Sequence, residues 1–100
     1  MDKRKDVISG RFIWSKWKSD RNVSMGRPPF SAAMSVFCDK NAMNVIAKDG
    51  KGPRRYGLYG KSNRGMFLLV IFAYHEKRIR LISVREDSKL KEQYDQKRKS

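Results

Sequence analysis

Hydrophobic positions in the first forty residues follow the spacing of helices, after one short strand. Residues 11–14 form a β-prone run that predicts this first strand. Ser15 is a favourable cap for a helix that runs to about Met25, and Gly26, followed by an arginine and two prolines, stops it. Beyond the prolines, four apolar residues share one helical face and predict a second helix: Phe30, Ala33, Met34 and Phe37.

After residue 42 the apolar positions favour strands. The predicted strands are residues 43–47, 55–60, 66–74 and 78–85. The first two flank a turn-rich segment, residues 48–53, and form a hairpin. The third is apolar at both its odd and its even positions, as expected for a central strand covered on both faces. Ser88 then offers a cap for a final helix, from Lys89 to about Gln96.

Strands joined through short turns, with helices kept to one side, predict an α+β domain. We expect two N-terminal helices and a C-terminal helix to pack on a mainly antiparallel sheet of four to five strands. The length of 100 residues suits a single domain. We place it at residues 11–96, with a flexible tail at residues 1–10 and a basic tail at residues 97–100.

The net positive charge of the chain indicates a negatively charged partner. The chain has 24 Lys and Arg residues against 10 Asp and Glu residues, a formal charge of +14 and a pI near 10.4. Residues 51–100 carry 14 of the basic side chains, so the second half should hold most of the binding surface. A charge of this size is typical of proteins that bind the phosphates of a nucleic acid, and we expect RNA.

Other classes of protein are disfavoured. The longest apolar run, residues 66–74, is far shorter than the roughly 20 residues of a membrane-spanning helix, so we expect no membrane partner. A lone cysteine, Cys38, and a charged start without an apolar signal segment favour the reducing cytoplasm. We find no CxxC pair and no Walker, GxGxxG, HExxH or GxSxG motif, and we expect neither a metal nor a cofactor.

Cationic residues can cleave RNA without a metal ion when the adjacent 2′-hydroxyl attacks the phosphorus. Arginine suits this chemistry because its planar fork binds two phosphate oxygens. The arginines in or beside predicted strands, which are either phosphate ligands or solvated surface charges, are Arg55, Arg78, Arg80 and Arg85. Five positions separate Arg80 from Arg85, so strict alternation places them on opposite faces unless a bulge or the strand end re-aims one.

The remaining candidates each have a structural alternative. His75, the only histidine, suits a general base, but its predicted turn favours a solvent-facing side chain. Lys18 and Asn22 share one face of the first helix and point to phosphate or to water. Aromatic residues can stack on bases or pack in a core, and basic residues contact phosphates. The residues expected to bind RNA are Arg55, Arg64, Arg78, Lys61 and Tyr59.

The order of these motifs resembles the BrnT-type toxins of bacterial type II toxin–antitoxin systems, within the broader RelE/ParE-like group. Residues 12–14, Phe-Ile-Trp, are similar to the family's opening Phe-x-Trp. Residues 79–85, Ile-Arg-Leu-Ile-Ser-Val-Arg, are similar to its Ile-Arg-Ile-Ile-Ser-Ala-Arg. The other matching positions are Lys18, Asn22, Phe30, Ala33, Val36, Phe37, Asp39, Arg55, Tyr56, Gly60 and Tyr94.

This resemblance implies a RelE-like compact fold and an RNA-cleaving activity that inhibits translation and growth. It also implies a cognate BrnA-like antitoxin, through which alone the toxin binds operator DNA. Lys18, Arg80 and Arg85 match positions where the family keeps basic side chains, so they and His75 are the catalytic candidates. Relatives commonly have Lys-His-Gly where this chain has Met-Gly-Arg at residues 25–27, so Gly26 stands at the family histidine position.

Three hypotheses therefore stand. The first is a toxin that acts as a metal-independent endoribonuclease. The second is a non-catalytic protein that binds RNA or the ribosome through the same charges, which the missing family histidine favours. The third keeps the fold but changes the target, as in relatives that poison DNA gyrase.

Overall fold

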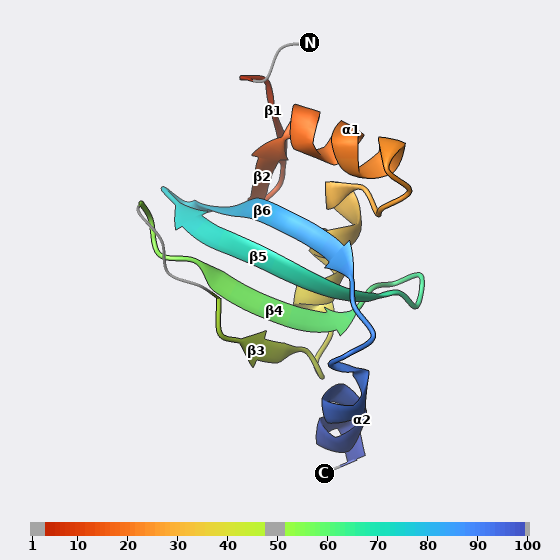
Figure 1. Cartoon of the computed structure of the whole chain (residues 1–100). Helices are drawn as coiled ribbons and strands as arrows, with labels where there is room; N and C mark the ends of the chain where they lie inside the picture. Colours follow the sequence, from red (N-terminus) through yellow and green to blue (C-terminus); the bar gives the residue numbers. More distant parts are fainter. Residues whose placement is uncertain (1–3, 48–51, 100) are drawn as a thin grey trace.

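The chain folds around one six-stranded sheet in a computed structural model that describes residues 4–47 and 52–99 (Figure 1). Strand order across the sheet is β1-β2-β6-β5-β4-β3. The helix η1 lies behind the sheet in this view, and α2 lies at the C-terminal end of the chain. The elements are β1 (Asp6–Ser9), β2 (Phe12–Ser15), α1 (Lys16–Ser24), η1 (Phe30–Cys38), β3 (Met43–Val45), β4 (Tyr56–Lys61), β5 (Phe67–His75), β6 (Arg78–Glu86) and α2 (Lys91–Lys99).

The α+β class is confirmed, but the sheet differs from the one expected. It has six strands rather than four or five, and it is mixed because β2 pairs with β6 in parallel. The described pairings of the other neighbours are antiparallel. The β3–β4 hairpin is confirmed, whereas residues 48–51 of its expected turn lie outside the described residues.

The N-terminal segment is more ordered than expected. We expected a flexible tail at residues 1–10, but Asp6–Ser9 form β1, which pairs with β2 along its whole length. Val7 packs against the core, and Gly10, with φ of 57°, allows the tight turn into β2. Residues 1–3 of the expected tail lie outside the described residues.

The first helix begins and ends close to the predicted residues. The Ser15 hydroxyl accepts a hydrogen bond from the backbone N–H of Lys18, which satisfies one donor of the first turn. The helix ends at Ser24, and Gly26 follows with a φ of 74°. The preceding strand has the expected length of four residues, but it is shifted by one position, to Phe12–Ser15.

The second predicted helix is present at Phe30–Cys38, but it is a 3-10 helix rather than an α-helix. A 3-10 helix has three residues per turn, and its buried residues follow that period: Phe30, Ala33 and Val36. Met34 and Phe37 of the expected stripe are only partly buried beside this row. Ser19 of α1 fixes the start of η1, because its hydroxyl accepts a hydrogen bond from the Phe30 N–H at 2.9 Å.

The predicted central strand is β5, which lies between β6 and β4. Leu68, Val70 and Phe72 face η1 in the main core. Leu69 and Ala73 are buried on the opposite face. Full burial of a large aliphatic or aromatic side chain stabilises a fold by about 1.5–3 kcal/mol, so β5 carries much of the core energy on both faces.

The C-terminal helix starts later and runs further than expected. Asp87 rather than Ser88 accepts a side-chain hydrogen bond at its start, from the Lys89 N–H. Residues 97–99 of the expected basic tail belong to α2, and residue 100 lies outside the described residues. Tyr94 of α2 packs with Tyr59 and Leu69 on the face of the sheet opposite η1.

Asp39 fixes α2 to the body of the domain. Its carboxylate accepts hydrogen bonds from the Tyr94 hydroxyl at 2.9 Å, from the Lys61 N–H at 2.8 Å and from the Asn41 N–H at 3.0 Å. Burial acts to raise the pKa of Asp39, but these hydrogen bonds outweigh it and hold the pKa below its usual value. The ionised carboxylate is therefore the form that stabilises this junction.

Candidate nucleic-acid interface

A β-bulge in β6 decides which of the candidate arginines share a face. Ile71 of β5 pairs with Ser83, whereas the next residue, Phe72, pairs with Leu81, so Ile82 is an extra residue. Leu81 and Val84 consequently both belong to the core under η1, although three positions separate them.

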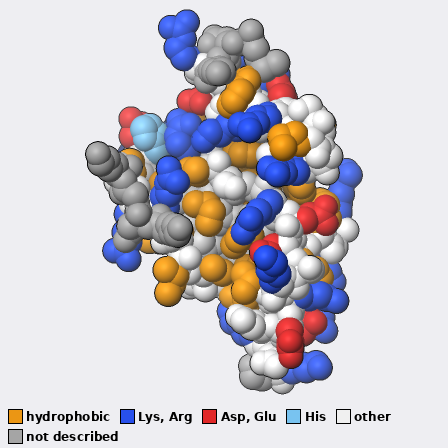
Figure 2. Space-filling model, in the orientation of Figure 1, with side chains coloured by type: hydrophobic (Ala, Val, Ile, Leu, Met, Phe, Trp, Pro, Cys, Tyr) orange, Lys and Arg blue, Asp and Glu red, His pale blue; other side chains and the backbone are white. Residues whose placement is uncertain are grey.

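The same bulge places Arg80 and Arg85 together on the opposite face. Their partners on β5 are Ala73 and Leu69, which are four residues apart and so point to one side of the sheet. Figure 2 shows this face, with Lys and Arg side chains gathered across its upper part beside the histidine. The separation of the two arginines that strict alternation predicts is therefore removed by the bulge.

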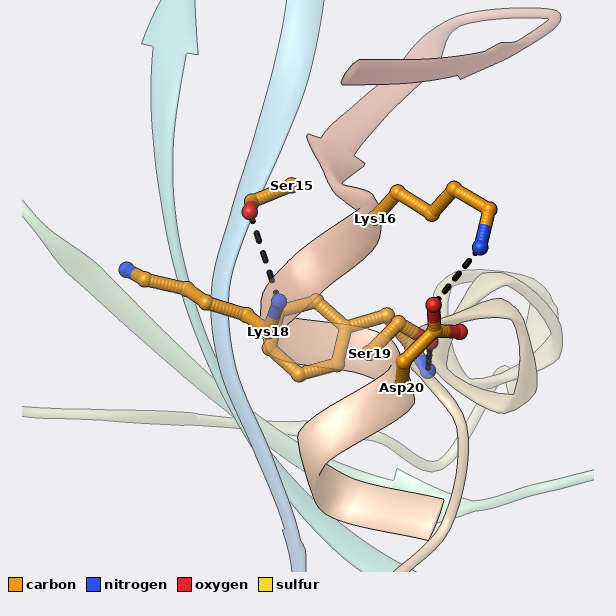
Figure 3. A network of polar contacts seen from close by, with 6 residues as sticks. Ser15, Lys16, Lys18, Ser19 and Asp20 are labelled. Atoms are coloured by element: carbon orange, nitrogen blue, oxygen red, sulfur yellow. Dashed lines mark hydrogen bonds and ion pairs between the residues drawn. The ribbon is translucent and has the colours of Figure 1, made fainter. Parts of the chain in front are cut away.

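A pocket of about 240 Å³ brings four predicted residues together. Lys18, Arg55, His75 and Arg80 line it, with apolar walls that include Ala73 and Ile82. We name this hollow the first pocket. Its lining residues come from α1, from the segment before β4, and from both strands of the β5–β6 hairpin. Figure 3 shows the Lys18 side chain extending from α1 past the ribbon of β6. The pocket therefore suits an anion whose charge several cations share.

Arg80 already binds one anion inside the chain. Its Nη2 lies 3.0 Å from Oδ2 of Asp6, and its Nη1 lies 3.4 Å from Oδ1. The two side chains are 30% and 34% exposed, so solvent screens the pair and limits its contribution to about 1 kcal/mol or less. An external phosphate can therefore compete with Asp6 for the guanidinium fork.

Arg85 lines a different pocket of about 410 Å³, together with Gly26, Arg27, Ser83 and Glu86. We name it the second pocket. A smaller hollow of about 200 Å³ lies between the two; it shares Lys18 with the first pocket and Arg27 with the second. The three hollows follow one another along β6 through their shared lining residues, and we call them together the groove.

Arg27 was not predicted as a site residue, yet it lines two of the three hollows. Its position next to Gly26, where relatives commonly have Lys-His-Gly, is the sequence feature that could have marked Arg27 as a candidate. Asn22 also lines these hollows, but its amide donates to the carbonyls of Val84 at 2.7 Å and Pro28 at 3.0 Å. Asn22 therefore holds α1 against β6 through backbone contacts, which neither of its expected roles included.

Four residues expected to bind RNA lie outside the first pocket. Tyr59 is fully buried and donates a hydrogen bond to the Asp87 carbonyl, so in this fold it packs in the core and cannot stack on a base. Burial, together with the nearby charges of Asp87 and Asp95, raises the pKa of Tyr59 to about 12. Arg78 is half-buried opposite His75. Lys61 and Arg64 are exposed at or after the end of β4, far along β5 from His75.

Among the described residues, no group of three or more His, Cys, Asp and Glu side chains is arranged to hold a metal ion. The same part of the chain has no helix long and apolar enough to cross a membrane.

The fold and the charge together define a basic α+β domain with a cationic groove beside β6. The family model described as the ribonuclease toxin BrnT of type II toxin–antitoxin systems matches residues 14–90. This match covers most of the sequence, and the chain therefore belongs to the BrnT family. A toxin of this class has a cognate antitoxin protein as its partner. A comparison with curated proteins returns no match.

Proposed function

We propose that this chain is an endoribonuclease toxin that cleaves RNA without a metal ion, with its reaction centre in the first pocket. The observation that carries this proposal is the meeting of Lys18, His75 and Arg80 around one hollow, with Arg55 on its rim. These residues supply positive charge for a phosphoryl group and groups that can exchange protons.

In the proposed reaction the ribose 2′-oxygen forms a bond to phosphorus while the bond from phosphorus to the 5′-oxygen breaks. The products are a 2′,3′-cyclic phosphate and a free 5′-hydroxyl. Arg80 and Lys18 bind the phosphoryl oxygens, and the Arg80 fork exchanges Asp6 for phosphate. His75 accepts the proton of the 2′-hydroxyl. The leaving 5′-oxygen then takes a proton either from His75 or from water.

The cellular setting belongs to the same proposal. The toxin acts in the cytoplasm, where cleavage of RNA inhibits translation and growth. A BrnA-like antitoxin neutralises it, and operator DNA is bound only through the toxin–antitoxin complex. Lys61, Arg64 and Arg78 contact RNA beyond the first pocket, since two of them are exposed and all three are cationic.

The test is to incubate the purified protein with RNA in the presence of EDTA and to map the new ends. We expect 2′,3′-cyclic phosphates, and we expect Arg80→Ala and His75→Ala each to lower the cleavage rate about 100-fold. Lys40→Ala is the matched control, because it removes one exposed charge outside the groove. Intact RNA with tight, salt-sensitive binding would instead favour the non-catalytic protein, and inhibited DNA supercoiling would favour a gyrase poison.

A further inference from the structure

The second pocket is a cationic site that the proposed cleavage chemistry does not use. Arg27 and Arg85 are both exposed there. The Arg85 guanidinium lies 3.9 Å from the Asp87 carboxylate, at the outer limit of an ion pair, and the Arg85 side chain is 60% exposed. Its fork is therefore available to an external anion. Glu86 adds one negative charge to the same wall.

The smaller hollow lies between the second pocket and the first pocket, because it shares Arg27 with the one and Lys18 with the other. The segment from residue 80 to residue 85 spans roughly 15 Å of extended strand, even allowing for the bulge. One phosphate group cannot reach both ends of such a segment. An anion that fills both pockets must therefore carry several phosphates along one flexible backbone.

We propose that Arg27 and Arg85 form a second phosphate subsite, which holds a neighbouring phosphate of the same RNA strand whose scissile phosphate lies in the first pocket. This inference rests on the proposed function and names its substrate as a single-stranded segment of several nucleotides. Each hollow of the groove takes a sugar or a base beside its phosphate, whereas a duplex keeps its bases inside and presents a regular outer surface.

A binding experiment tests the subsite without requiring cleavage. The probe is a fluorescent single-stranded RNA with 2′-O-methyl riboses, which removes the attacking hydroxyl. We expect Arg85→Ala and Arg27→Ala each to weaken binding about tenfold. Each should also reduce the slope of log K against log salt by about 0.7, the value for one phosphate contact of a single strand.

Glu86→Gln should tighten binding of the RNA probe, because it removes the negative charge from the subsite wall. Lys40→Ala is the control and should leave the salt slope unchanged. Salt slopes that stay at the wild-type value in both arginine variants would overturn the subsite. Equal affinity for a duplex of the same sequence would overturn the single-stranded substrate.

Cleavage kinetics separate this role from catalysis. A dinucleoside monophosphate has one phosphate and cannot fill both pockets. We expect Arg85→Ala to raise KM for an oligonucleotide about tenfold while kcat stays unchanged, and to leave cleavage of the dinucleoside monophosphate unaffected. An equal loss of kcat on both substrates would overturn the inference and assign Arg85 to the reacting phosphate. If the wild-type protein cleaves neither substrate, the proposed function fails, whereas the binding experiment still decides the subsite.

Discussion

The face of the sheet opposite η1 has two ends that differ in almost every property. At one end α2 covers an aromatic cluster, made of Tyr59, Tyr94 and their neighbours, and Asp39 fixes the helix in place. At the other end the groove of Lys18 and Arg80 lies open to solvent. We name these the closed end and the open end. One continuous face therefore supplies stability at its closed end and exposed positive charge at its open end.

The largest expected effect is the loss of stability when the closed end is emptied. Tyr94→Ala removes a buried ring that contacts Tyr59 and Phe67, and we expect it to cost about 3 kcal/mol of unfolding free energy. Urea denaturation measures this loss. RNA cleavage per folded molecule should remain at the wild-type level, and a specific loss of cleavage would show that the two ends are not independent.

A smaller effect at the same end comes from the charge of Asp39. Asp39→Asn weakens the hydrogen bonds from Tyr94 and from the backbone, and we expect a loss of about 2 kcal/mol. Because the pKa of Asp39 in the folded chain lies below its usual value of 3.8, the ionised carboxylate favours folding. Its contribution is complete above about pH 5 and is lost as the pH falls through 3.8 and then through the folded pKa.

This pH dependence separates Asp39 from the other carboxylates. Wild-type stability, measured by urea denaturation between neutral and acidic pH, should fall more steeply than that of Asp39→Asn. Parallel profiles for the two proteins would contradict the assignment.

At the open end, Asp6→Asn should change binding more than stability. Removing the carboxylate costs about 1 kcal/mol or less, because the pair with Arg80 is partly exposed. It also frees the Arg80 fork, so we expect inorganic phosphate to bind several-fold more tightly. Isothermal titration with phosphate measures this affinity. A weaker affinity would mean that Asp6 orients Arg80 rather than competing for it.

The smallest effect is expected on the exposed side of α1. Lys16 and Asp20 form an ion pair one helical turn apart at 2.6 Å, with side chains 49% and 48% exposed (Figure 3). Asp20→Ala should cost less than about 0.5 kcal/mol and leave RNA binding unchanged. A thermal melt and a binding titration check both values. A large loss in either would show that the exposed side of α1 contributes to stability or to RNA binding.

The features that the sequence predicted are those set by neighbouring residues. Ser15 marks the start of α1, and the two-sided apolar pattern of β5 marks the centre of the sheet, because a cap and a burial pattern are local properties. The short strand β1 escaped prediction, since four residues beside a glycine carry little signal. The 3-10 form of η1 escaped as well, since its three-residue row is close to a helical stripe.

Features that depend on distant contacts were harder to predict. No glycine or proline marks the bulge at Ile82, and a β-branched residue at this position is typical of a regular strand. Tyr59 reads as a possible stacking residue until α2 is seen to cover it. Arg27 reaches the groove only because Asn22 ties α1 to the edge of β6.

The bulge at Ile82 has a consequence for how such a groove could change. Because Ile82 has no partner on β5, the bulge fits one additional residue into β6 while Leu81 and Val84 both still face the core. Deleting Ile82 would remove the bulge and leave Leu81 and Val84 facing the core, with Arg85 still on the opposite face. A relative that lacks this extra residue would keep each side chain on the same face, but aligning its β6 segment without a gap would pair residues that face opposite sides.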